Sequence, residues 1–158
     1  MSPSIHAGAA IAALVLGAVV VSMSKGTTRH RAAGACYVGL LLLSNAVALT
    51  LTRTTGGFGP FHVLAIVSLC TLAVGLVPMW ILPRSPGAIA VHGITMGFSY
   101  IGLVAAGLSQ AVAQLIPEHS SAGVLATSVI TFTLGAAVIF RLTPRSLART
   151  HASSPRQS

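Results

Sequence analysis

Negative charge is nearly absent from this sequence, because one acidic residue stands against nine basic residues in a chain of 158. Charged residues of both signs make up 6% of the chain, which is too little to cover the surface of a water-soluble domain. Cysteine is also scarce. Cys36 and Cys70 lie in apolar stretches, and neither has a second ligand at metal-site spacing. We therefore expect both cysteines to be packing residues.

The distribution of the few charges excludes two functional classes. The net charge of +8 does not indicate nucleic-acid binding, because the basic residues lie between apolar runs rather than on one face of a polar domain. No apolar segment contains Asp or Glu, so the chain lacks the buried carboxylate with which ion-driven transporters commonly bind a cation or relay protons. Histidine is left as the ionisable side chain available for chemistry.

Apolar residues make up most of the chain: 54% of the residues are hydrophobic and the mean hydropathy is +0.88. A helix that crosses a bilayer needs about 20 apolar residues. Five segments qualify, at about residues 5–23, 32–51, 61–82, 87–116 and 122–142. The sequence therefore predicts an all-α, polytopic transmembrane helical bundle over residues 1–142. Residues 143–158 are polar and basic, and we expect them to form a disordered cytoplasmic tail.

Basic residues in the loops predict the orientation of the chain, because cytoplasmic loops are enriched in Lys and Arg. If the loop after the first segment is cytoplasmic, only Arg53 among the basic residues is outside, and Glu118 is outside as well. The basic residues then inside are Lys25, Arg29, Arg31, Arg84, Arg141, Arg145, Arg149 and Arg156. We predict an N-terminus outside, a cytoplasmic C-terminus and the lipid bilayer as the surrounding medium.

Four histidines lie at or near the starts of the first four segments: His6, His30, His62 and His92. Because consecutive transmembrane helices are antiparallel, His6 and His62 are expected on the outer side. By the same reasoning His30 and His92 are expected on the inner side. The sequence thus predicts one histidine pair in each leaflet.

Helical periodicity places small and polar residues on the same faces as these histidines. The predicted faces are His6, Ala9, Ala10, Ala13 and Gly17 in the first segment, His30, Gly34, Tyr37, Leu41, Ser44 and Asn45 in the second, and His92, Met96, Ser99, Tyr100, Leu103, Gly107, Gln110 and Gln114 in the fourth. Polar side chains predict that the second and fourth faces point into the bundle. The small residues allow close helix packing, or they make room for a flat cofactor.

Haem b is the cofactor that paired histidines on facing helices favour, because haem iron accepts two axial imidazole ligands. We predict one haem between His6 and His62 and a second between His30 and His92. Lys and Arg in the loops lie near enough in sequence to pair with haem propionates. The predicted cofactor-binding residues are His6, His62, His30, His92, Gly34 and Tyr100, of which the four histidines are the metal ligands.

Two other metals and a structural role are alternatives for the same histidines. Catalytic zinc is held by three histidines and a water, but zinc hydrolases usually recruit a carboxylate as general base, and none lies near the apolar segments. Copper is bound by His, Met and Cys, although Met23, Met79 and Met96 are scattered along the chain. A histidine within a membrane can also be a hydrogen-bonded structural group.

Three motifs look familiar: KGTxxHRxxG at residues 25–34, Phe61-His62, and HxxxMxxxY from His92 to Tyr100. With them the chain resembles a bacterial family of small integral membrane proteins, known only as a predicted membrane domain of unknown function. The resemblance covers residues 5 to 115 and leaves the fifth segment outside. It implies four core helices plus a fifth helix, in the bacterial cytoplasmic (inner) membrane, and no established activity.

Two functions are the leading hypotheses, and the sequence leaves open whether the chain is an enzyme. The first is a small b-type membrane cytochrome that transfers electrons through bis-histidine haem to a quinone or another redox membrane protein. Its paired histidines are similar in arrangement to those of two-haem membrane cytochromes, which is an architectural analogy. The alternative is a non-enzymatic accessory subunit of a larger membrane complex, with structural histidines. A metal-dependent membrane hydrolase is a third class.

Overall fold

The computed structural model describes residues 3–50, 60–81, 85–116 and 120–152. All the secondary structure in these residues is helical, which confirms the predicted fold class. The helices are α1 (Pro3–Ser22), α2 (Thr28–Thr50), α4 (Pro60–Ile81), α5 (Pro86–Leu115) and α6 (Ser120–Ala152). Four residues that enter the charge count lie outside the described residues: Arg53, Arg84, Glu118 and Arg156.

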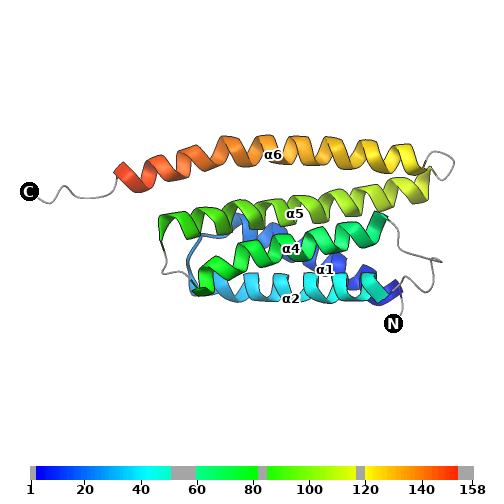
Figure 1. Cartoon of the computed structure of the whole chain (residues 1–158), viewed down its shortest axis with the longest axis horizontal. Coiled ribbons are helices and arrows are strands. Elements are labelled where there is room, and N and C mark those ends of the chain that lie inside the picture. The colour runs from blue at the N-terminus through cyan, green and yellow to red at the C-terminus, as the bar shows by residue number, and fades with distance from the viewer. Residues whose placement is uncertain (1–2, 51–59, 82–84, 117–119, 153–158) are drawn as a thin grey trace, which may run out of the picture.

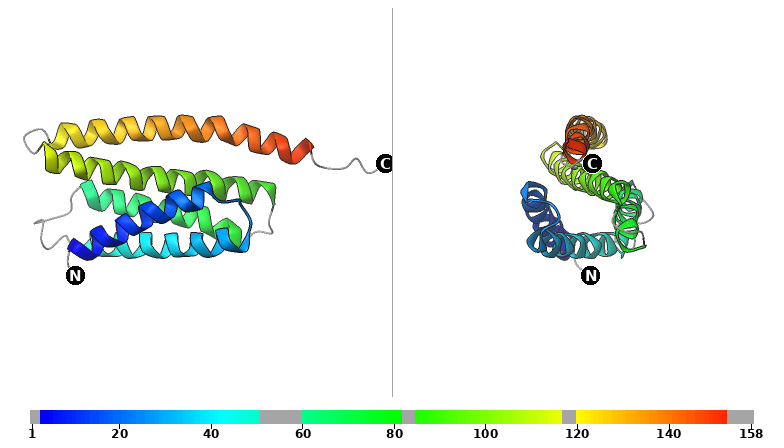
Figure 2. Two further views of the ribbon diagram at one scale, coloured as in Figure 1. Left: turned by 180° about the vertical axis from the view of Figure 1, so that it is seen from behind. Right: turned by 90° about the vertical axis from the view of Figure 1, so that its left-hand side faces the viewer.

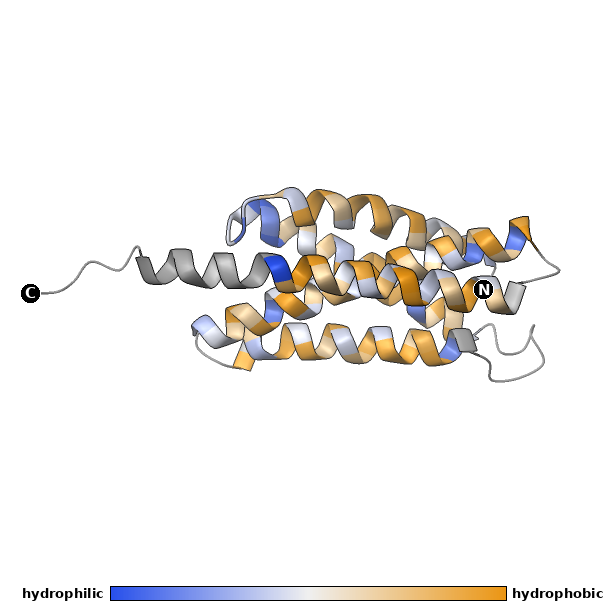
Figure 3. Cartoon of the chain, turned by 90° about the horizontal axis from the view of Figure 1, so that it is seen from above, coloured by the Kyte–Doolittle hydropathy of each residue, from blue (hydrophilic) through white to orange (hydrophobic). Residues whose placement is uncertain are grey.

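Each of these helices is long and apolar enough to cross a membrane. Hydrophobic residues cover the middle of the helices, and hydrophilic residues gather toward their ends (Figure 3). Successive helices are antiparallel, so α2 and α5 begin at the same end of the bundle (Figure 1). We call this the basic end, because Lys25, Arg29 and Arg31 lie there, and we call the other the opposite end.

Four helices form a ring in the order α1, α2, α4, α5 (Figure 2). Each of them packs on the next, and α5 packs on α1 to close the ring. Consequently α1 lies diagonally opposite α4, and α2 lies diagonally opposite α5. Helix α6 lies outside the ring along α5 (Figure 2). The described residues therefore form four core helices and a fifth, as predicted.

Tyrosine and leucine side chains fill the middle of the ring around small residues of α1. The buried cluster consists of Ala13, Tyr37, Leu41, Leu72 and Leu103. Gly17 allows a close approach to this cluster, because a Cβ atom there would lie 2.5 Å from Cδ2 of Tyr100 and 3.0 Å from Cε2 of Tyr37. Glycine thus lets two aromatic rings lie against the backbone of α1.

Hydrogen bonds between side chains join several of the packed helices. Such bonds hold helices together in a bilayer, where apolar side chains gain little by leaving lipid. The side-chain pairs are Asn45 and Ser68 between α2 and α4 (2.9 Å), Tyr37 and Ser99 between α2 and α5 (3.1 Å), and Ser109 and Ser128 between α5 and α6 (2.9 Å). The Tyr37–Ser99 bond crosses the ring between diagonal helices.

Helix α2 begins at Thr28 rather than at residue 32, so its first turn contains Arg29, His30 and Arg31. The cause is an N-cap: the Thr27 hydroxyl accepts a hydrogen bond from the backbone N–H of His30 at 3.1 Å. The apolar run starts later than the helix because this first turn is charged. Helix α5 has a similar start, in which the Ser85 hydroxyl accepts from the backbone N–H of Ala88.

The predicted inner face of α5 holds only in the first part of the helix. Ser99 and Leu103 are buried, but Gln110 and Gln114 are exposed, so the prediction that these glutamines point into the bundle is wrong. With 30 residues α5 is about 45 Å long and exceeds the roughly 30 Å hydrocarbon layer, so its last turns reach past the apolar region. In this part Ser109 is the buried polar residue, facing α6.

Helix α6 is longer than its apolar span. Its candidate span is Ala122–Arg141, but the helix continues to Ala152. The structure therefore places residues 143–152 in a helix, where the sequence predicted a disordered tail. Leu, Ala and Arg are good helix formers, and the preceding turns supply a nucleus from which the helix can propagate.

Candidate functional site

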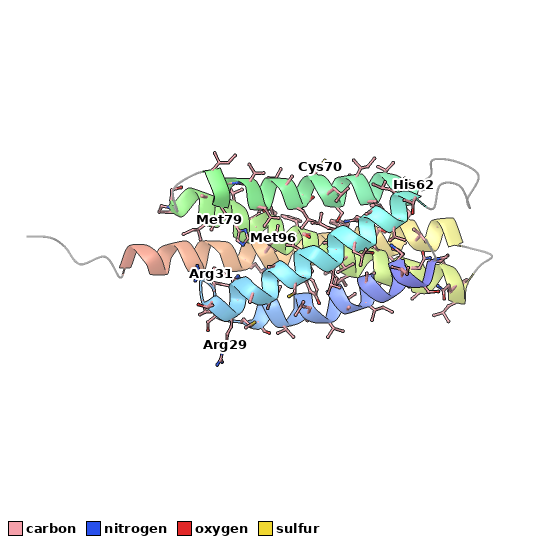
Figure 4. All side chains as sticks on the ribbon, turned by 90° about the horizontal axis from the view of Figure 1, so that it is seen from below. Arg29, Arg31, His62, Cys70, Met79 and Met96 are labelled. Carbon is pink, nitrogen blue, oxygen red and sulfur yellow. The ribbon has the colours of Figure 1, made fainter. Side chains whose placement is uncertain are left out.

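The ring places each predicted histidine pair on diagonally opposite helices. His30 of α2 and His92 of α5 are at the basic end, whereas His6 of α1 and His62 of α4 are at the opposite end. Figure 4 shows His62 at the far end of α4 from Met79. Diagonal helices face each other across a four-helix ring, so the two histidines of each pair lie on helices that face one another.

His92 is fixed by the backbone of α4. Its Nδ1 atom lies 2.9 Å from the carbonyl oxygen of Gly75. A carbonyl oxygen can only accept, so the ring donates from Nδ1, and the neutral imidazole keeps its lone pair on Nε2. This is the arrangement in which metal-binding histidines are commonly held, with one ring nitrogen on a carbonyl and the other toward the metal.

His30 is partly buried in the first turn of α2. Its Nδ1 atom is buried and has no hydrogen-bond partner among the described residues. The imidazole lies close enough to His92 and to Lys25 to interact electrostatically with both. One turn further along α2, a Cβ atom at Gly34 would meet nothing within 4 Å, so space is open beside the histidine. The basic end therefore brings both predicted inner ligands together.

Lys25 gives the basic end a fixed positive charge. Its ammonium donates hydrogen bonds to the carbonyl oxygens of Val20 at 3.0 Å and Val21 at 2.6 Å, and so caps the last turn of α1. Desolvation by the surrounding protein lowers the pKa of Lys25 from its ordinary value. A hollow of about 450 Å³ at the same end is lined by Met23, Ser24, Thr27, Thr28 and Arg29.

His6 is fixed at the opposite end by one residue of α2. Its Nδ1 atom lies 3.0 Å from both the carbonyl oxygen and the hydroxyl oxygen of Ser44. The Ser44 hydroxyl also lies 3.4 Å from the carbonyl oxygen of His6. The carbonyl again requires a proton on Nδ1, which leaves the lone pair on Nε2. His62 is 5% exposed on α4, so it faces into the ring.

Tyr100 and Gly8 lie in different surroundings. Tyr100 lies against Gly17 beside Tyr37, which puts it in the packed middle of the ring between the two histidine pairs. Gly8 is exposed, so it gives no clearance on the inner face of α1. The neighbours of Tyr100 could not be read from helical periodicity, which gives the face of a helix but not the helix it meets.

Other metal arrangements have less support within the part of the chain that the structure describes. No group of three or more His, Cys, Asp or Glu residues comes together there. Cys36 and Cys70 are both exposed (Figure 4 shows Cys70 on the outer side of α4). Met79 and Met96 both lie toward the basic end of the bundle (Figure 4).

In the comparison with protein families, residues 4–147 match the family described as "Predicted membrane protein (DUF2306)". The chain belongs to this family of membrane proteins of unknown function. The match extends well beyond residue 115 and includes most of α6, so the expectation that the fifth helix stands outside the family is wrong. No curated protein and no solved structure matches the chain.

Proposed function

We propose that the chain is a small b-type membrane cytochrome, in which His30 and His92 hold a haem at the basic end and His6 and His62 hold a second at the opposite end. The single observation that carries the proposal is the placement of the four histidines, two at each end of the ring on diagonal helices. Haem, when bound, supplies one-electron redox chemistry. The protein's part is ligation, orientation and exclusion of water.

Orientation of the imidazoles is supported at both ends by backbone carbonyls. The carbonyl oxygens of Gly75 and Ser44 accept from Nδ1 of His92 and His6, so each ring presents Nε2 for ligation. The imidazole of His30 interacts with the backbone carbonyl of Val20, and its buried Nδ1 atom is the nitrogen left for a ligand. Open space beside Gly34 gives clearance for a flat group at this end.

The middle of the ring separates the two proposed sites. Tyr37, Leu41, Leu72 and Leu103 pack there with Ala13 and exclude water from the space between the histidine pairs. At the basic end, Arg29 lines an open hollow and Lys25 caps the last turn of α1, and the charges of these two cations suit the carboxylates of haem propionates. The two ends thus differ in charge while sharing the same kind of ligand.

The proposal includes an orientation and a partner. The basic residues gathered at the end where α2 begins favour a cytoplasmic location for this end and an outer N-terminus, in a bacterial inner membrane. A membrane quinone or another redox membrane protein would then exchange electrons with the chain. Labelling of Ser4→Cys and Ser24→Cys with an impermeant maleimide in intact cells tests the orientation. Only the first should react, and a reaction of Ser24→Cys alone would reverse it.

An absorption spectrum of the detergent-solubilised protein tests the haem directly. Protein produced with haem supplementation should show a Soret band when oxidised and split α bands when reduced. A colourless preparation that is fully helical by circular dichroism would contradict the proposal, because the histidines would then be present in a folded chain without binding haem.

A second proposal, an accessory subunit of a larger membrane complex, is favoured by the free surface of α6. In its candidate span no residue is buried within the described part of the chain, and the helix packs chiefly on α5. Native purification separates the two proposals. An accessory subunit should co-migrate with a partner and tolerate replacement of any single histidine, whereas the cytochrome should lose absorbance with each.

A further inference from the structure

We propose that Gly75 of α4 is the positioning residue of the basic-end site: its carbonyl sets the tautomer of His92, and its missing side chain lets α5 come close enough for that bond. The effect of Gly75 on haem affinity rests on the proposed function. The contact between Gly75 and His92 involves only residues of the protein, so it can be tested without a cofactor.

The carbonyl oxygen of Gly75 has two lone pairs, so it can accept from a neighbouring helix as well as from its own helix. Pro78 lies inside α4 and removes the donor for the carbonyl of Val74, next to Gly75, and carbonyls in a turn loosened in this way accept from neighbouring helices. His92 makes such a contact, with Nδ1 at 2.9 Å from the Gly75 oxygen. The bond joins the end of α4 to the beginning of α5.

A side chain at position 75 has no room. A Cβ atom there would lie 2.4 Å from the terminal methyl of Met96 and 2.6 Å from Oγ1 of Thr95. The methyl of Met96 can move, because it ends a flexible side chain. Thr95 cannot move easily, because its hydroxyl donates to the carbonyl of Val91 at 2.7 Å and its Cβ would itself be 3.4 Å away. Alanine at position 75 must therefore push α5 away from α4.

Separation of the two helices breaks the bond that fixes His92. Without an acceptor at Nδ1, the neutral imidazole is no longer held in the Nδ1–H tautomer. The proton can then reside on Nε2, where it blocks binding of a ligand. Loss of an outer-shell partner of a metal-binding histidine typically costs roughly 10- to 100-fold in affinity. The expected result for Gly75→Ala is a loss of this size at the basic end, with the opposite end unchanged.

Nitrogen-15 NMR of the haem-free protein with labelled histidine tests the positioning. His92 is assigned from the signal that disappears in His92→Gln. In the wild-type protein it should show the Nδ1–H tautomer, and in Gly75→Ala this signal should be lost. The matched control is Gly93→Ala, beside His92 on the same helix, where an added Cβ meets nothing within 4 Å. The control should keep the wild-type signal.

A double variant guards against a misfolded Gly75→Ala protein. Replacing Thr95 by Ala as well removes the obstructing hydroxyl, so Gly75→Ala/Thr95→Ala should recover the tautomer signal. An unchanged His92 signal in Gly75→Ala would overturn the inference, and so would loss of the signal in the double variant. If the NMR results are as expected but no variant, nor the wild type, binds haem, the proposed function fails while the positioning of His92 by Gly75 stands.

Discussion

At the basic end of the ring the histidine of α5 is tied to a backbone carbonyl of α4, whereas at the opposite end the histidine of α1 is tied to both the carbonyl and the hydroxyl of Ser44. The first bond depends on a residue without a side chain, because a Cβ atom at Gly75 has no space. The second bond includes the hydroxyl of Ser44 in addition to its carbonyl. We therefore expect a larger side chain at Gly75 to disrupt the basic-end histidine, and loss of the Ser44 hydroxyl to leave the opposite-end histidine in place.

Charge is the other difference between the ends. Lys25 lies within electrostatic range of His30, with its ammonium held by two carbonyls of α1. A nearby cation favours the reduced form of a haem, which carries one negative charge more than the oxidised form. We therefore expect the basic-end haem to have the higher midpoint potential of the two.

The largest effect should come from removing one ligand. Replacing His30 or His92 by Ala should abolish the basic-end haem and keep the other, and replacing His6 or His62 should do the converse. Reduced-minus-oxidised spectra should show that each of the four variants loses about half of the α-band absorbance, since one of two ligand pairs is broken. The control is His151→Ala, at the last turn of α6. Equal loss of both haems in all four variants would remove the distinction between the ends.

The next largest effect should be a loss of stability of the whole bundle, caused by a substitution in the middle of the ring. Gly17→Ala adds a Cβ atom 2.5 Å from the Tyr100 ring in the middle of the ring, and overpacking of this kind costs about 1–3 kcal/mol of stability. Thermal unfolding followed by circular dichroism should show a lower midpoint. Gly39→Ala on α2, where a Cβ meets nothing within 4 Å, is the matched control. An unfolding midpoint equal to that of the control would mean that the close aromatic packing is not a source of stability.

A smaller effect should appear on one potential only. Lys25→Gln removes the cation beside His30 and should lower the midpoint potential of the basic-end haem, with a free-energy change on the order of 1 kcal/mol or less because solvent screens the charge. A potentiometric titration resolves the two haems. Arg141→Gln, at the end of the α6 span and outside the ring, is a suitable control. A shift of the other haem instead would reverse the assignment of charge to the ends.

The smallest effect should come from Ser44→Ala. The variant removes the hydroxyl but keeps the carbonyl that accepts from Nδ1 of His6, so the tautomer should be retained. Spectra and haem content should stay within experimental error of the wild type, and stability should fall by no more than about 1 kcal/mol, the range for an interhelical hydrogen bond in a membrane. Loss of the opposite-end haem would show that the hydroxyl, not the carbonyl, holds the ring.

Much of the fold could be predicted from the sequence because the bilayer imposes it. Spans of about 20 apolar residues, punctuated by polar connections, fix the number of helices and their alternating direction. The start of α2 was misplaced because hydropathy alone ignores the charged first turn, although Thr27 carries the N-cap signal that identifies it. The exposed Gln110 could have been anticipated from the length of α5, which exceeds the hydrocarbon layer.

For the candidate site, the sequence predicted the four histidines and the end of the bundle at which each one lies. Alternating helix direction was sufficient to pair His30 with His92, because it depends on the chain order alone. It could not show that Gly75 accepts from His92 or that Gly17 receives Tyr100, because these contacts depend on which helices are neighbours and how they are rotated. Periodicity along one helix contains no information on its neighbour.

The haem content per chain tests the central claim most directly. The protein is purified in detergent after expression with excess haem, the haem is quantified as its pyridine complex, and the chain is quantified by amino-acid analysis. With a bis-histidine site at each end of the ring, we expect a ratio of two haems per chain. A folded, helical protein with no bound haem would contradict the account.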